Sequence, residues 1–127
     1  MRGSKKGENM KDNVRVLMID DNKELVKMIK EYFKDHANIK VVMEANDGAE
    51  GLKLIKEKPS EYDVILLDLI MPKKDGVQVL EELKEEGINK KIIVLTSYNA
   101  QEMIRRVSEL GINYFILKPF ELTDLEK

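Results

Sequence analysis

Short apolar runs alternate with amphipathic stretches along the chain from residue 14 onward. Each run is four to six residues long, which suits a β-strand, and most runs are continuous rather than alternating. Continuous apolar strands are typical of a parallel sheet whose two faces are both covered by helices. The predicted strands are Val14–Ile19, Ile39–Met43, Val64–Leu67, Ile92–Leu95 and Tyr114–Leu117.

The segments between these runs carry apolar residues at helical spacing. Asp47 is placed to cap the second of these helices, the third ends before Gly87, and Gly111 follows the fourth in the C′ position. The apolar stripes of the four predicted helices run from Leu25 to Phe33, from Ala49 to Ile55, from Val77 to Leu83 and from Met103 to Leu110.

This alternation predicts an α/β fold with a doubly wound, five-stranded parallel sheet of flavodoxin-like strand order 2-1-3-4-5. Residues 14–127 form one expected domain, ending in a fifth helix truncated after about two turns. Residues 1–13 contain no apolar signal-peptide core, and they are interpreted as a flexible leader or a remnant of an expression vector.

Composition narrows the function classes. The 22 Lys and Arg residues nearly balance 24 Asp and Glu residues, so no net basic field draws the chain to nucleic acid or anionic lipid. There is no Cys, which excludes disulfides and thiolate metal sites and suits a reducing cytoplasm. No apolar stretch approaches the ~20 residues of a membrane helix. We therefore expect a cytoplasmic domain that binds neither nucleic acid nor membrane directly.

Polar residues follow four of the predicted strands. Asp20 and Asp21 follow the first strand, Asp68 the third, Thr96 the fourth and Lys118 the fifth. In a doubly wound sheet these strand ends share one edge, and the first and third strands are neighbours there. The three carboxylates are therefore expected to converge in one shallow cleft.

Three carboxylates this close repel one another, and a divalent cation removes that conflict. Mg²⁺ prefers oxygen ligands and retains several waters, so two carboxylates and a carbonyl suffice. A carboxylate can attack phosphorus to form an acyl phosphate, while Lys118 and Thr96 offer a positive charge and a hydrogen bond to the phosphoryl oxygens. The set predicts phosphoryl acceptance on Asp68, assisted by Mg²⁺.

Each residue also has a purely structural interpretation. An Asp after a strand often caps a helix, Thr96 precedes a helix where it could cap, and an isolated Lys118 would be a solvated surface residue. That interpretation requires all these groups to meet at one edge of one sheet by coincidence.

The chain from Val14 to Leu125 resembles the receiver domain of two-component response regulators. Four segments carry the resemblance in order and spacing: Asp20-Asp21, Asp68 to Pro72 with Asp75-Gly76, Thr96-Ser97, and Lys118-Pro119-Phe120. The resemblance implies a phosphorylation-activated switch rather than an enzyme with its own substrate. A histidine kinase or a histidine phosphotransfer protein would supply the phosphoryl group.

The resemblance also assigns the individual residues. Asp68 would be the phosphoacceptor. Asp21, Asp68 and the backbone carbonyl of Ile70 would bind the metal directly, with Asp20 acting through water.

Three further positions belong to the expected switch. Thr96 would supply the switch hydroxyl, Lys118 would contact the phosphoryl group, and Phe115 would be the aromatic switch residue. The Lys118–Pro119 peptide bond is expected to be cis, a form that costs an X-Pro bond little.

Two segments, Asp20 to Leu25 and Leu110 to Phe120, are similar to the receiver half of the sporulation transcription regulators of spore-forming Firmicutes. This similarity implies a DNA-binding output domain in a full-length protein. The alternative is a stand-alone phosphorelay shuttle.

Two rival functions fit the sequence less well. Haloacid-dehalogenase-type phosphatases need a second Asp two residues after the nucleophile, where this chain has Ile70. A nucleotide- or flavin-binding module needs glycines after the first strand, where this chain has Asp20 and Asp21.

The short fifth helix carries a further expectation. Residues 121–127 would make only about two helical turns, leaving apolar surface of the sheet and first helix uncovered. Such a surface favours self-association, so a homodimer is expected.

Overall fold

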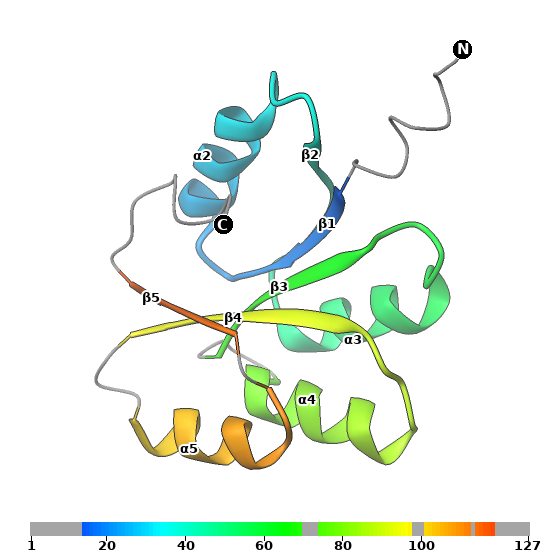
Figure 1. Cartoon of the computed structure of the whole chain (residues 1–127), viewed down its shortest axis with the longest axis vertical. Coiled ribbons are helices and arrows are strands. Elements are labelled where there is room, and N and C mark those ends of the chain that lie inside the picture. Colours follow the sequence, from blue (N-terminus) through cyan, green and yellow to red (C-terminus); the bar gives the residue numbers. More distant parts are fainter. Residues whose placement is uncertain (1–13, 70–73, 98–100, 113, 119–127) are drawn as a thin grey trace.

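The computed structural model describes residues 14–69, 74–97, 101–112 and 114–118, with the backbone alone at residues 96, 97, 117 and 118. Strands and helices alternate through these residues (Figure 1). In chain order the elements are β1 (Val14–Ile19), α2 (Lys23–Phe33), β2 (Ile39–Ala45), α3 (Gly48–Glu57), β3 (Val64–Asp68), α4 (Gly76–Glu85), β4 (Lys91–Ser97), α5 (Gln101–Glu109) and β5 (Phe115–Lys118).

The five strands form one parallel sheet in the order β2-β1-β3-β4-β5. The predicted fold class and strand order are therefore confirmed, whereas the predicted fifth helix at residues 121–127 lies outside the described residues. β3 lies at the centre of the sheet, with β1 on one side and β4 on the other. This order brings the carboxyl ends of β1 and β3 together, which is the arrangement that the site requires.

The strands begin and end close to the predicted positions. Where the observed ends differ from the predicted ones, polar residues lie at or next to those ends. β4 continues through Thr96 and Ser97, which pair in register with Leu117 and Lys118 of β5. Tyr114 lies just before β5 and is exposed, although its carbonyl oxygen already accepts a hydrogen bond from the amide of Val94. Backbone pairing thus extends a strand beyond its apolar run.

Polar side chains cap the start of three helices. The side chain of Asn22 accepts a hydrogen bond from the amide of Leu25 at α2, and Asp47 accepts one from Glu50 at α3. The predicted cap at Asp47 is confirmed. Each such cap stabilises a helix by about 1 kcal/mol.

Glycines end α4 and α5. Gly87 and Gly111 have φ angles of 71° and 94°, a region that only glycine enters without strain. At both ends the amides of the glycine and of the residue after it donate to carbonyls in the last turn of the helix, as in a Schellman motif. The predicted stops at Gly87 and Gly111 are confirmed.

The sheet carries a hydrophobic core on each face. α3, α4 and α5 cover one face, where their buried side chains, including Ile55, Leu80 and Val107, meet those of β1, β3 and β4. α2 covers the other face, packing Ile29 and Phe33 onto Met18, Leu66 and Leu95. Both faces of the central strands are therefore buried, as their continuous apolar runs predicted.

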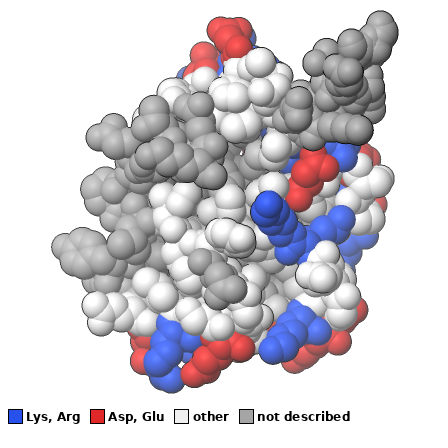
Figure 2. Space-filling view, in the orientation of Figure 1, with Lys and Arg blue, Asp and Glu red and all other residues white. Residues whose placement is uncertain are grey.

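Acidic and basic side chains alternate over α4 and α5, along the lower edge of the molecule in Figure 2. Arg106 on α5 pairs with Glu81 on α4 at 2.8 Å, and Arg105 pairs with Glu102 within α5. Within the described part of the chain, no helix is long and apolar enough to cross a membrane.

Candidate functional site

Three aspartates meet at the carboxyl edge of the sheet. Asp20 and Asp21 follow β1 directly, and Asp68 is the last residue of β3. Each offers a carboxylate oxygen, and these oxygens lie within 4.8 Å of one another. The predicted convergence of the three carboxylates is confirmed, and we refer to Asp20, Asp21 and Asp68 as the acidic cluster.

The members of the acidic cluster differ in exposure. Asp20 is fully buried and Asp68 is 6% exposed, whereas Asp21 is exposed to solvent. The Asp20 carboxylate accepts a hydrogen bond from the amide of Asn22 at 2.9 Å, and the Asp20 amide donates to the carbonyl of Ala45 at 3.1 Å. Two carboxylates are thus fixed in the fold while the third faces the solvent from which a ligand would arrive.

This donor set fits a hard divalent cation. Carboxylate oxygens are the ligands that Mg²⁺ prefers, at about 2.1 Å, and opposite ligands in its octahedron then lie about 4.2 Å apart. Oxygens within 4.8 Å of one another reach that spacing with small side-chain rotations or through a bound water. The exposed side at Asp21 leaves room for the waters that Mg²⁺ retains.

The predicted positions on β4 and β5 lie at the same edge of the sheet. Asp68 is in register with Leu95 on β4, and Thr96 is the next residue. Thr96 pairs with Leu117 and Ser97 pairs with Lys118 on β5. Thr96 and Lys118 therefore stand at the same edge of the sheet as Asp68, Thr96 on the neighbouring strand and Lys118 one strand further away. Their side chains lie outside the described part of the structure.

Phe115, the predicted aromatic switch residue, begins β5 and is partly buried. It packs against the core on the face covered by α3, α4 and α5. Ile70, whose carbonyl was the predicted third metal ligand, and Pro119, with its predicted cis bond, lie outside the described residues.

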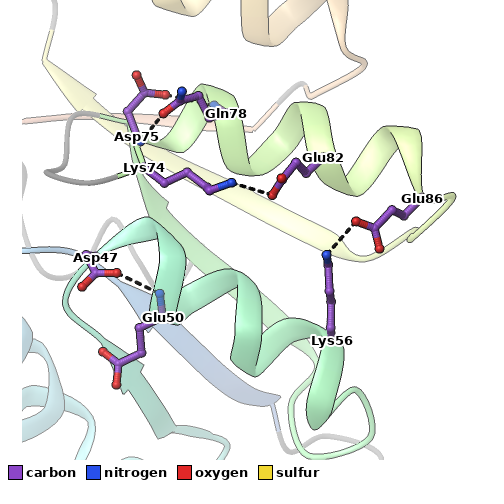
Figure 3. A network of polar contacts seen from close by, with 8 residues as sticks. All are labelled: Asp47, Glu50, Lys56, Lys74, Asp75, Gln78, Glu82 and Glu86. Atoms are coloured by element: carbon purple, nitrogen blue, oxygen red, sulfur yellow. Dashed lines mark hydrogen bonds and ion pairs between the residues drawn. The ribbon is translucent and has the colours of Figure 1, made fainter.

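The start of α4 is fastened to the end of β3. The amide of Gly76 donates to the carbonyl of Leu69 at 2.8 Å, and Asp75 and Gln78 form a reciprocal capping box. Lys74 pairs with Glu82 on the second turn of α4 at 2.9 Å (Figure 3). Sequence reasoning recognised the Asp75-Gly76 segment but missed these contacts, because they depend on how closely the helix approaches the strand.

The opposite, amino-terminal end of β3 carries a different kind of aspartate. Asp63 accepts hydrogen bonds from the Arg15 backbone amide and from two nitrogens of its guanidinium group, at 2.8 to 3.1 Å. These bonds to Arg15 hold the pKa of Asp63 below its usual value, against a smaller opposing effect of burial. Asp63 is therefore neutralised by a neighbour within the fold.

Comparison with known proteins places this site in a family. The family model of the response regulator receiver domain matches residues 16–127, which include the whole acidic cluster. The receiver domain of the Francisella response regulator 1452 is 33% identical, with a TM-score of 0.76 over 89% of this chain and 90% of that one.

Two further solved structures agree. The receiver domain of the response regulator NarL from Mycobacterium tuberculosis is 28% identical, with a TM-score of 0.78 over 90% of each chain. A chain of the CheX–CheY–BeF3–Mg complex from Borrelia burgdorferi is 26% identical, with a TM-score of 0.78 over 89% of this chain and 84% of that one. With its fold, its acidic cluster and these matches, the chain belongs to the response regulator receiver domains of two-component signalling systems.

Proposed function

We propose that Asp68 accepts a phosphoryl group from a phosphohistidine donor, with Mg²⁺ bound at the acidic cluster. The observation that carries this proposal is the convergence of three carboxylates at the ends of β1 and β3, with their oxygens within 4.8 Å. Asp68 is at the centre of the sheet edge, beside both the other carboxylates and the end of β4.

The transfer needs only one bond to form and one to break. A carboxylate oxygen of Asp68 attacks phosphorus, the bond between phosphorus and the donor imidazole breaks, and the imidazole nitrogen keeps the bonding electrons. The product is an acyl phosphate on Asp68. Bound Mg²⁺ would supply positive charge that offsets the phosphoryl oxygens near the carboxylates.

The proposed metal ligands are Asp21, Asp68 and the backbone carbonyl of Ile70, with Asp20 acting through water. Burial supports different roles for the two adjacent aspartates. Asp21 is exposed and can contact a cation directly, whereas Asp20 is fully buried and hydrogen-bonded to the amide of Asn22.

The switch that follows phosphorylation is proposed to involve Thr96, Lys118 and Phe115. Lys118 would pair with a phosphoryl oxygen and the Thr96 hydroxyl would donate a hydrogen bond to another. The place of both residues at the ends of β4 and β5 supports these roles. Movement of Thr96 would open space for the partly buried Phe115 ring and reshape the surface around α5 and β5. The bond between Lys118 and Pro119 is proposed to be cis.

Residues 14–127 are proposed to act as one receiver unit. Its donor would be a histidine kinase or a histidine phosphotransfer protein. The Borrelia complex, which contains CheX, CheY, BeF3 and Mg, supports a metal-dependent role in this family. The unit is proposed to promote only its own phosphorylation and dephosphorylation.

Two segments, residues 20–25 and 110–120, are similar to the receiver half of sporulation regulators. This similarity supports control of a DNA-binding output domain. None of the three solved structures named above is identified by its name as a sporulation regulator, so this narrower proposal rests on those two segments alone. A stand-alone relay shuttle is the alternative. Transfer of the phosphoryl group onward to a histidine phosphotransfer protein would favour the shuttle.

Intact-mass measurement after incubation with a small phosphodonor tests the proposal. We expect one phosphoryl adduct that requires Mg²⁺, is removed by alkali or hydroxylamine, and is absent from Asp68→Asn. An adduct of equal yield in Asp68→Asn would contradict the assignment. Sustained turnover of a small phosphomonoester would instead indicate a phosphatase.

A further inference from the structure

Gly76, the first residue of α4, packs directly against the peptide that follows Asp68. A Cβ atom added at Gly76 would lie 2.5 Å from the carbonyl oxygen of Asp68 and 2.7 Å from the Cα atom of Leu69. Both contacts are to backbone atoms, which have no rotamer through which to move aside. Any side chain at this position would therefore force α4 and the end of β3 apart.

The end of β3 has little freedom to yield to such a force. The amide of Leu69 donates to the carbonyl of Leu95 on β4 at 3.3 Å, and the Leu69 side chain is fully buried. The carbonyl of Leu69 accepts from the amide of Gly76 at 2.8 Å. Separation of α4 from β3 would strain this bond and shift the backbone that carries Asp68.

Gly48, the first residue of α3, makes a second close approach from the neighbouring helix. A Cβ atom there would lie 1.8 Å from the carbonyl oxygen of Lys74, two residues before Gly76. Figure 3 shows Lys74 and Asp75 beside the start of α3, with the Lys74 ammonium group directed to Glu82. The start of α4 is therefore confined between the end of β3 and the start of α3.

We propose that Gly76 and Gly48 are positioning residues that set where the Asp68 carboxylate lies relative to Asp20 and Asp21. The inference rests on the proposed phosphorylation of Asp68. An added methyl group at Gly76 must move from 2.5 Å to ordinary contact at 3.4 Å or more, a shift approaching 1 Å. A misplacement of this size can lower the rate of a reaction by about 100-fold.

The test compares two alanine substitutions at opposite ends of the same helix. Gly76→Ala disturbs the contact with Asp68. Gly87→Ala is the control, because Gly87 has a φ of 71° and nothing lies within 4 Å of an added Cβ atom. Both substitutions are expected to lower the melting temperature, Gly87→Ala through backbone strain. Only Gly76→Ala should affect the chemistry.

The readouts are the rate constant for phosphorylation by a small phosphodonor at saturating Mg²⁺ and the affinity for Mg²⁺. They are measured at a temperature where circular dichroism shows each variant folded. We expect Gly76→Ala to lower the rate constant at least about tenfold, and Gly87→Ala to leave it within about twofold of wild type. Equal rate constants in the two variants would overturn the inference.

Gly48→Ala provides a second variant should Gly76→Ala not fold. The Lys74 carbonyl that it displaces lies in a connecting segment rather than in the sheet, so the fold has more room to adjust. A several-fold lower rate constant is expected, and a wild-type rate constant in folded Gly48→Ala would overturn the inference. Wild-type protein that forms no adduct would contradict the proposed function itself. Failure of the proposed function can therefore be told apart from failure of the positioning inference.

Discussion

The two ends of β3 carry aspartates in opposite circumstances. Asp63 stands just before the strand, its side chain 41% exposed and held by Arg15 through hydrogen bonds and an ion pair. Asp68 ends the same strand, is 6% exposed, and lies with Asp20 and Asp21 in the acidic cluster. The first aspartate is paired with an arginine, and the second lies close to two other carboxylates.

On the function proposed above, this difference separates a structural carboxylate from a reactive one. A carboxylate paired with arginine contributes to the fold and is a poor nucleophile for an incoming anion, because its charge is already engaged. Carboxylates gathered within 4.8 Å repel one another in the folded state, which costs stability. Such a cluster is useful where a cation and a phosphoryl group relieve the repulsion.

The largest expected effect concerns metal binding. Asp21→Ala removes the exposed carboxylate of the acidic cluster, so we expect the affinity for Mg²⁺ to fall at least about tenfold, which corresponds to about 1.4 kcal/mol. Glu24→Ala, which removes another exposed acid three residues away on α2, is the control and should change the affinity little. Titration calorimetry measures both. Unchanged Mg²⁺ affinity in Asp21→Ala would contradict the proposed ligand set.

The next effect concerns stability, which we expect to change in opposite directions when Asp68 and Asp63 are each replaced by Asn. In metal-free buffer, Asp68→Asn removes a charge from the acidic cluster and should raise the free energy of unfolding by on the order of 1 kcal/mol. Asp63→Asn removes the partner of Arg15 and should lower it slightly, as expected for an exposed ion pair. Urea unfolding of the two variants measures both changes. Destabilisation of both to the same extent would remove the distinction between the two ends of β3.

A related effect concerns stabilisation by metal. Mg²⁺ binds the folded state, so adding it should raise the melting temperature of wild type and of Asp63→Asn. Asp68→Asn should show a much smaller rise, because one direct ligand is lost. A full Mg²⁺-dependent rise in Asp68→Asn would show that the cation binds elsewhere.

The smallest effect is the pH dependence of the Asp63–Arg15 pair. The pKa of folded Asp63 is lowered from its ordinary value of 3.8 by the bond to Arg15. Its contribution to the free energy of unfolding is therefore fully present above the unfolded pKa and is lost as pH falls through the folded pKa. The stability difference between wild type and Asp63→Asn should shrink as pH falls below 3.8 and vanish once pH is well below the lowered pKa of the folded protein. A difference that persists unchanged in acid would contradict this assignment.

The pattern of residues predicted the fold and the acidic cluster because both follow from the spacing of the apolar residues and from the order of the strands. Continuous apolar runs indicated buried parallel strands, and Asp20, Asp21 and Asp68 converge wherever the first and third strands are neighbours. No three-dimensional detail was needed for either conclusion.

The close contacts of Gly48 and Gly76 could not be predicted in the same way. A glycine at a helix start is compatible with many packings, and only the distance from its missing Cβ atom to the neighbouring backbone shows why no side chain fits. The pairing of Arg15 with Asp63 could not be predicted either, since the partners are 48 residues apart, one within β1 and the other just before β3. Sequence patterns report local periodicity, whereas these contacts depend on tertiary packing.

Reductive trapping of the phosphorylated protein identifies the residue that carries the phosphoryl group. Borohydride converts an aspartyl phosphate to homoserine, and peptide mapping by mass spectrometry locates the modified residue. After treatment with a small phosphodonor and Mg²⁺, we expect homoserine at position 68 alone, with none at positions 20, 21 and 63. Homoserine at any of those positions in place of 68, or equal labelling without Mg²⁺, would contradict the proposed phosphorylation of Asp68.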